Sequence, residues 1–327
     1  MRRVVLARVA GPAWRRLSTA AAAASHAGGR VVTVTSGKGG VGKTTTAASF
    51  AYGLAELGKK TVVIDFDIGL RNLDIHLGCE RRVIFDFVNV LQKECTLSQA
   101  LIKDKRCPNL HVLAASQTKD KNILTVEGVG ALFDELRKQF DYIVCDSPAG
   151  IESGARHAMY FAGAPSIAAT LQRVEHGAVF LLSSTPTPHP PDEAIICTNP
   201  ELSSCRDSDK MIGFIASKSH RAEQNRSAVV QRLLVTRYDP ERAAKDETLS
   251  LEDIGELLGL PLLGVIPESK AVLTSTNLGQ PVIASQDRAG EAYKDLVRRF
   301  LGEEVPFRFI KQEEKSFFAR IFGAGRS

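Results

Sequence analysis

The chain has 327 residues, of which 44% are hydrophobic and 24% are charged, and its formal net charge is +5. This length can bury one sizeable α/β domain, and no second autonomous domain is visible. The sequence contains no apolar run long enough to span a membrane and no internal repeat. These observations exclude a helical integral membrane protein and a repeat protein.

The excess positive charge lies in the first thirty residues, which contain six arginines and no acidic residue. Without them the chain is near neutral, which removes the main compositional argument for DNA binding. An Arg-rich, acid-free leader predicts an organelle transit peptide over residues 1–29, with a basic arm that binds nucleic acid as the alternative. Residues 15–19, Arg-Arg-Leu-Ser-Thr, resemble a matrix-processing site. We therefore expect the protein to lie in the mitochondrial matrix, peripheral on the inner membrane. The alternative location is the plastid stroma and inner envelope.

From residue 30 to about 305, apolar strand-like runs alternate with helical patterns. This alternation predicts an α/β fold, with a mostly parallel sheet and helices on both faces. The expected strands are 31–36, 61–66, 110–114, 141–146, 193–198, 229–236 and 262–266. The expected helices are 43–57, 83–92, 125–139, 152–162, 203–217, 251–258 and 287–301.

A glycine-rich loop, Gly37 to Thr44, joins the first expected strand to the first expected helix. This strand–loop–helix arrangement is typical of a phosphate-binding loop, so the chain is expected to be a single P-loop NTPase domain. Backbone N–H groups and the helix N-terminus favour phosphate, Lys43 can reach the β- and γ-phosphates, and the Thr44 hydroxyl can hold Mg²⁺. The expected nucleotide contacts are Gly39, Gly40, Val41, Gly42, Lys43, Thr44 and Thr45.

Three carboxylates follow the next buried strands. Asp65 and Asp67 come at the end of the second strand, and Asp146 ends the run from Tyr142. The carboxyl ends of parallel strands face the ligand crevice of such a sheet. Asp146 has the setting of a Walker B aspartate, which contacts Mg²⁺ directly or through water.

Lys38 lies inside the loop at a position where most phosphate-binding loops accept almost any residue. The pattern Lys-Gly-Gly-Val-Gly-Lys-Thr-Thr, residues 38–45, resembles the deviant Walker A motif of the MinD/ParA ATPases. Further matches to the MinD branch run from Val31 to about Phe322, among them residues 147–152 and 264–268. The resemblance implies ATP and Mg²⁺ as cofactors and an ATP-dependent homodimer.

The same resemblance assigns roles to individual residues. It implies that Lys38 reaches the partner's nucleotide, that Asp67 orients the attacking water, and that Asp65 supports the Mg²⁺ shell. The expected catalytic residues are therefore Lys38, Lys43 and Asp67, and the expected metal-site residues are Thr44, Asp65 and Asp146. Asn199 and Asp239 follow strands where family loops surround the adenine, although ordinary turn chemistry also explains them.

The six cysteines are scattered and never form a Cys-x-x-Cys pair. They are expected to be buried small hydrophobic residues rather than a disulfide framework or a metal site. Metal-bridged relatives that share the deviant loop use close cysteine pairs, so those classes are disfavoured.

Residues 163–191 depart from the family pattern, which runs directly from helix to strand. The end of this segment is rich in proline and predicts irregular coil. It is either an atypical insertion or a translated unspliced intron.

Residues 306–327 are expected to form a linker and a C-terminal amphipathic helix. Phe317, Phe318, Ile321 and Phe322 fall within an arc of roughly 140° at 100° per residue. Apolar residues beside basic ones at a chain end suit reversible binding to an anionic membrane. The alternative is a tail that docks on the domain's own core.

The resemblance implies a membrane-cycling ATPase that positions the division site, with a MinE-like activator and a MinC-like inhibitor of FtsZ assembly as partners. No nucleic acid is expected. A ParA-like DNA or cargo segregation ATPase is the alternative, because it would keep every phosphate-binding residue. A nucleotide-binding scaffold without turnover would need Asp67 to be missing, and Asp67 is present.

Overall fold

A computed structural model describes residues 28–119, 123–150, 193–218 and 228–311. The described chain forms an eight-stranded sheet in the order β3-β4-β2-β5-β1-β6-β7-β8. All neighbouring strands are parallel except β3 and β4, which are antiparallel. The strands are β1 (Arg30–Thr35), β2 (Thr61–Asp65), β3 (Ile102–Lys103), β4 (Leu110–Leu113), β5 (Tyr142–Asp146), β6 (Glu193–Thr198), β7 (Val230–Tyr238) and β8 (Leu262–Pro267).

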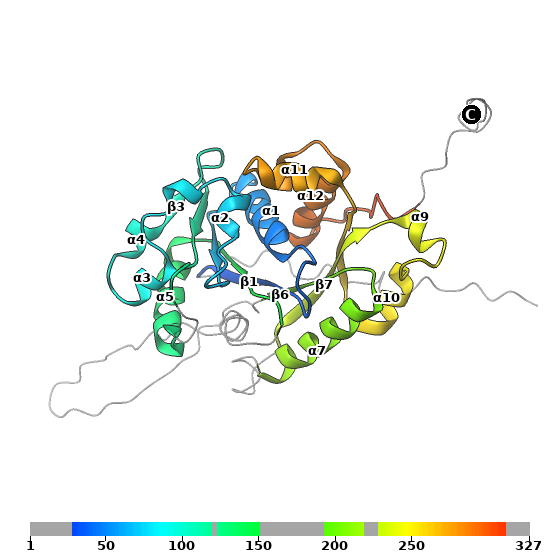
Figure 1. Ribbon diagram of the computed structural model, residues 1–327, viewed down its shortest axis with the longest axis horizontal. Helices are drawn as coiled ribbons and strands as arrows, with labels where there is room; N and C mark the ends of the chain where they lie inside the picture. The colour runs from blue at the N-terminus through cyan, green and yellow to red at the C-terminus, as the bar shows by residue number, and fades with distance from the viewer. Residues whose placement is uncertain (1–27, 120–122, 151–192, 219–227, 312–327) are drawn as a thin grey trace, which may run out of the picture.

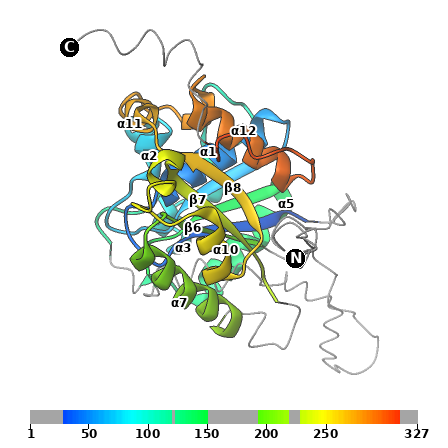
Figure 2. The same cartoon turned by 90° about the vertical axis from the view of Figure 1, so that its right-hand side faces the viewer.

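Helices cover both faces of this sheet (Figures 1 and 2). One face carries α1 (Lys43–Glu56), α2 (Leu73–His76), α11 (Lys270–Asn277) and α12 (Arg288–Phe300). The other carries α3 (Phe87–Leu91), α5 (Val126–Gln139), α7 (Leu202–Lys218) and α10 (Leu251–Leu258). The described part of the chain also contains α4 (Leu97–Ala100), α9 (Pro240–Ala243) and the 3₁₀ helices η2 (Glu80–Arg82) and η4 (Val282–Ala284).

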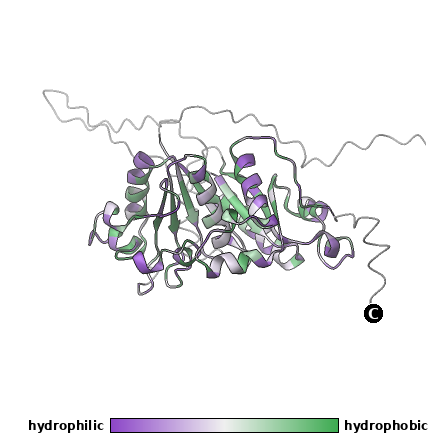
Figure 3. Cartoon of the chain, turned by 90° about the horizontal axis from the view of Figure 1, so that it is seen from above, coloured by the Kyte–Doolittle hydropathy of each residue, from purple (hydrophilic) through white to green (hydrophobic). Residues whose placement is uncertain are grey.

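The strands are buried on both sides because successive side chains point to opposite faces. In β1, Val32 and Val34 join the cluster under α1 and α12, whereas Val31 joins the cluster under α5. Figure 3 shows the hydrophobic strands between the more polar outer surfaces of the helices. The buried apolar runs of the sequence therefore correspond to central parallel strands.

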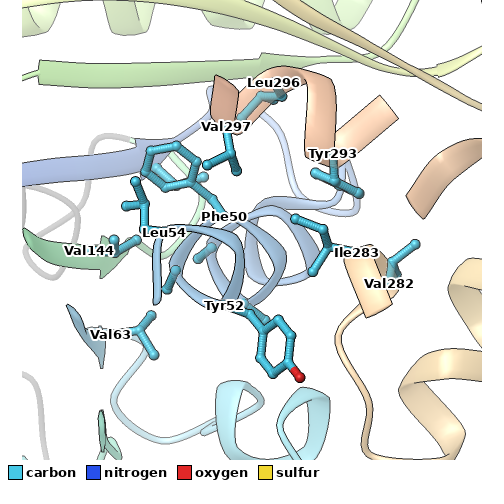
Figure 4. Close-up of a cluster of buried hydrophobic side chains, with 14 of the residues drawn as sticks. Phe50, Tyr52, Leu54, Val63, Val144, Val282, Ile283, Tyr293, Leu296 and Val297 are labelled. Carbon is cyan, nitrogen blue, oxygen red and sulfur yellow. The ribbon is translucent and has the colours of Figure 1, made fainter. Parts of the chain in front are cut away.

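Helix α1 is the most enclosed helix on its face. Phe50 and Leu54 point toward the sheet and α12 (Figure 4), and the Phe50 ring lies edge-on to Phe300 with centroids 4.8 Å apart. A Cβ on Gly53 would lie 2.5 Å from the Ile283 side chain, so the small residue permits close packing against η4. Close packing at Gly53 thus helps to hold α1 in place, together with the loop that precedes it.

The described chain ends in a segment, residues 305–311, that packs back on the domain. Arg308 donates to both carboxylate oxygens of Asp295 on α12, at 2.7 and 2.9 Å. Phe307 and Ile310 pack against the cluster formed by β7, β8 and α10. The start of the expected linker is therefore held on the domain surface.

The α/β fold class and the seven expected strands are confirmed, with ends that shift by one or two residues. Helix 83–92 was wrong in its first turn, because α3 begins only at Phe87. Asp86 precedes it and accepts hydrogen bonds from the backbones of Val88 and Asn89. The short elements α2, α4, α9, α11 and β3 were not predicted.

Some predictions lie outside the described residues: helix 152–162, segment 163–191, the leader and the tail residues Phe317, Phe318, Ile321 and Phe322. Where the chain is described, no helix is long and apolar enough to cross a membrane. All six cysteines are free, and five of them are buried as expected, with Cys95 partly exposed.

Candidate nucleotide site

The glycine-rich loop leaves β1 and enters α1 with an open outer side. Gly40 and Gly42 have φ values of +76° and +87°, which favour glycine. A Cβ at Gly39, Gly40 or Gly42 would meet nothing within 4 Å, so this part of the loop has room for a ligand. The Val41 side chain is fully buried, and its carbonyl accepts a 2.7 Å hydrogen bond from the Thr236 hydroxyl. Val41 thus anchors the loop, while the glycines of the loop stay accessible.

Lys43 lies at the start of α1 and is 8% exposed. Its ammonium group donates to the Ser36 hydroxyl at 3.0 Å and to the Lys38 carbonyl at 3.4 Å. Burial lowers the pKa of Lys43, and the negative charge of Asp146 opposes that effect. The Lys43 ammonium group therefore lies beneath the loop, where oxygens of Ser36 and Lys38 fix its position.

Asp65 and Asp146 are neighbours, because they end the adjacent parallel strands β2 and β5 in register. They are 1% and 2% exposed. Burial raises the pKa of Asp65 to about 7. Burial and then the charge of Asp65 raise the pKa of Asp146, whereas a hydrogen bond from Thr44 and the charge of Lys43 lower it. Among the described residues, Oδ1 of Asp146 has no hydrogen-bond partner.

Asp67 lies two residues beyond β2 in the loop that leads to α2. Its side chain is partly exposed, and its charge acts on Lys43, Asp65 and Asp146. The loop makes tight turns, with the Asp67 carbonyl accepting from the backbones of Leu70 and Arg71 at 3.1 Å each. Asp67 therefore lies close enough to Lys43 and to both buried aspartates to interact with them electrostatically.

Lys38, the second lysine of the loop, bonds within its own chain. Its ammonium group lies 2.9 Å from the Glu201 carboxylate and 3.2 Å from the Ser203 hydroxyl at the start of α7. The Lys38 and Glu201 side chains are 40% and 51% exposed. A surface ion pair of this kind contributes little free energy, so it can exchange for another partner.

The two predicted base-side residues differ in accessibility. Asn199 is 6% exposed, and its side-chain amide lies 2.9 Å from the Thr236 hydroxyl. Asp239 caps α9 and lines a surface pocket of about 210 Å³. Asn199 therefore braces the loop through Thr236, and Asp239 borders open space. The pocket is lined by Tyr238, Asp239, Pro240, Glu241, Pro267, Glu268 and Arg288.

The structure thus brings Lys43, Thr44, Asp65, Asp67 and Asp146 together at the carboxyl ends of β1, β2 and β5. Sequence reasoning missed Ser36 and Thr236, which hold the loop, and Pro267, Glu268 and Arg288, which border the pocket. The carboxyl-end rule applied to β8 would have pointed to Pro267 and Glu268.

Comparison with known proteins supports this geometry. Residues 32–282 match the model of the CobQ/CobB/MinD/ParA nucleotide binding domain. The chain is 54% identical over 296 residues to the septum site-determining protein MinD of Escherichia coli, covering 90% of this chain and 99% of that protein. The chain belongs to the MinD family.

Solved MinD-family structures share the fold. The MinC:MinD cell division protein complex of Aquifex aeolicus is 35% identical, with a TM-score of 0.68 over 85% of this chain and 98% of that one. MinD complexed with Mg-ADP from Pyrococcus horikoshii is 23% identical, with a TM-score of 0.64 over 84% and 99% of the two chains, and shows the fold alone. The present chain therefore matches these relatives over nearly their whole length.

Proposed function

We propose that this MinD-family chain is a Mg²⁺-dependent ATPase that hydrolyses ATP to ADP and phosphate and helps to position the division site. The observation that carries the proposal is the group formed by buried Lys43 and Asp146 with half-buried Thr44, behind an open glycine loop. The 54% identity to the septum site-determining protein of Escherichia coli supports the biological role.

The residues present fit ATP and Mg²⁺. The glycines leave space where a Cβ would otherwise project, and Lys43 supplies a positive charge beneath the loop. One carboxylate oxygen of Asp146 has no partner in the described chain, and the carboxylate also accepts a hydrogen bond from the Thr44 hydroxyl. A hydroxyl and a carboxylate are the oxygen ligands that Mg²⁺ accepts. When bound, the ion would neutralise negative charge on the phosphates.

The chain's own residues then have distinct roles. The backbone of residues 39–45 and the Lys43 ammonium group bind and orient the phosphates, and Asp67 orients the attacking water. Positioning and charge neutralisation supply the rate, because phosphoryl transfer needs little covalent help from the protein. On dimerisation, Lys38 leaves its ion pair with Glu201 and contacts the nucleotide of the second subunit. This contact links ATP binding to dimerisation.

The dimer is proposed to bind an anionic membrane through the tail residues Phe317, Phe318, Ile321 and Phe322. Burying one phenylalanine is worth roughly 1.5–3 kcal/mol, so one short tail binds weakly. Pairing makes insertion of the second tail intramolecular and raises the avidity. Membrane binding should therefore require ATP.

Partners and location are proposed on different grounds. The Aquifex aeolicus structure is a MinC:MinD complex, which supports a MinC-like partner for this chain. A MinE-like activator is proposed from the family resemblance, and the Arg-rich leader supports a proposed location in the mitochondrial matrix, peripheral on the inner membrane. The plastid remains the alternative location.

Sedimentation with anionic liposomes tests the proposal. The wild-type chain should pellet with vesicles in ATP and Mg²⁺ but not in ADP. A Phe318→Glu, Phe322→Glu double variant should form ATP-dependent dimers yet stay in the supernatant. Pelleting of the double variant, or a wild-type dimer that prefers duplex DNA to lipid, would favour the ParA-like alternative.

A further inference from the structure

The carboxylate of Asp65 is the centre of a hydrogen-bonding arrangement that the catalytic scheme does not use. Oδ1 accepts the backbone N–H of Asp67 at 2.8 Å. Oδ2 accepts the backbone N–H groups of Asn72 and Leu73 at 3.1 and 3.2 Å. Both ends of the loop 66–72 are therefore tied to one buried side chain.

This arrangement differs from that of Asp146, the other buried aspartate. An ionised carboxylate offers about four lone-pair sites, and three of those on Asp65 are engaged by backbone donors. Oδ1 of Asp146 has no partner in the part of the chain that the structure describes. Direct metal binding by Asp65 would compete with the bonds that hold the loop, whereas Asp146 has an oxygen available.

Other contacts also hold the loop: Phe66 is fully buried, and Arg71 donates to the Asp74 carboxylate at 2.6 Å. Gly69 and Leu70 are exposed, and the Gly69 backbone donates to the Ser116 carbonyl at 2.8 Å. Asn72 precedes the four-residue helix α2, but its side chain makes no capping bond. Oδ2 of Asp65 accepts instead from the N–H groups of Asn72 and of Leu73, the first residue of α2.

We propose that Asp65 is a positioning residue that orders the loop carrying Asp67, rather than a ligand of the metal. This inference rests on the proposed function, in which Asp67 orients the attacking water. The bond to the Asp67 N–H fixes the backbone from which that side chain projects, and the bonds to Asn72 and Leu73 fix the far end of the loop.

Asp65→Asn tests the proposal, because asparagine keeps the size of the side chain but retains one acceptor oxygen in place of two. Hydrogen exchange of the ligand-free full chain should show a loss of protection of roughly 10-fold or more at the amides of residues 67, 72 or 73. The matched variant Asp146→Asn should leave these amides protected. Unchanged protection in Asp65→Asn would overturn the proposal.

Kinetics separate loop positioning from metal binding. In Asp65→Asn, kcat should fall roughly 10-fold or more, since small misplacements of a positioned group have large effects on rate. The ATP KM and the Mg²⁺ concentration for half-maximal rate should stay within about twofold of wild type. Asp146→Asn should instead raise the Mg²⁺ requirement. A raised Mg²⁺ requirement with an unchanged kcat in Asp65→Asn would show that Asp65 acts on the metal.

A second variant perturbs the loop without touching the carboxylate. Gly69 has a φ of +99°, so Gly69→Ala strains the loop even though a Cβ there meets open space. It should lower kcat with an unchanged Mg²⁺ requirement, and an unaltered kcat would contradict the proposal even if Asp65→Asn does not fold. If the wild-type chain shows no Mg²⁺-dependent turnover, the proposed function fails, while the hydrogen-exchange arm still tests the loop contacts.

Discussion

The buried pair Asp65 and Asp146 should make the ligand-free chain less stable as the pH rises. Burial raises the pKa of Asp65 from 3.8 to about 7, and it raises the pKa of Asp146 as well. A carboxyl group whose pKa is higher in the folded chain holds its proton more tightly there. Its stabilising contribution is therefore present at low pH and is lost as the pH rises from about 4 through the folded value.

For Asp65 the difference is roughly three pKa units, and each unit corresponds to ~1.4 kcal/mol, so the loss approaches about 4 kcal/mol. The two carboxyl groups titrate as a pair. Burial lowers the pKa of His76 and His111, which acts in the opposite sense because neutral histidine stabilises the fold as the pH rises. A variant is therefore needed to separate the aspartates from the histidines.

Asp146→Asn removes one carboxyl group of the pair and leaves both histidines. Between pH 4.5 and pH 8, the free energy of unfolding of this variant relative to wild type should rise, because the variant no longer has to ionise Asp146 in the folded chain. Urea unfolding in EDTA, followed by circular dichroism, measures this difference. Asp209→Asn, at an exposed position on α7, is the control because it leaves both buried aspartates in place. A relative stability of Asp146→Asn that does not change with pH would refute the reasoning.

Further predictions concern the loop and its neighbours. Lys43→Ala should abolish tight ATP binding, measured by calorimetry, because it removes the buried cation held by Ser36; affinity within a few fold of wild type would contradict this role. Glu201→Gln should strengthen ATP-dependent dimerisation by roughly 2- to 30-fold in light scattering, because Lys38 loses a pair worth ~0.2–1 kcal/mol in each of two subunits. Lys38→Ala should instead bind ATP but stay monomeric. Asp67→Ala should bind ATP and remain dimeric while phosphate release falls on the order of 10²-fold, and near-normal turnover would move the role elsewhere.

The sequence predicted the sheet well because central parallel strands need continuous apolar runs. Thr61–Asp65 and Tyr142–Asp146 are such runs, and each ends in a carboxylate that the carboxyl-end rule places in the crevice. The helices α2, α4 and α9 were not predicted because their four residues are too few to show a 3.6-residue period. The expected helix 83–92 began too early, since Ile84 is 83% exposed and Asp86 caps the helix at a later position.

The site was predictable only where a motif fixes both spacing and setting. The bond from Lys38 to Glu201 joins residues 163 positions apart, and no local pattern predicts it. The three backbone bonds to Asp65 depend on how the loop after β2 turns back, which spacing alone does not specify. The resemblance implies a metal-site role for Asp65, and these hydrogen bonds are the basis of the loop-positioning role that we propose for it.

The stability of the fold and the affinity of the site are linked through the same two carboxylates. Asp65 and Asp146 lie side by side between hydrophobic clusters that keep water out, so each raises the free energy of ionising the other. A cation bound near Asp146 favours the ionised pair and removes much of that repulsion. Free energy that opposes folding of the ligand-free chain therefore contributes to binding of Mg²⁺ with nucleotide. It follows that Mg²⁺ and ATP should stabilise the wild-type chain more at pH 8 than at pH 5, and more than they stabilise Asp146→Asn.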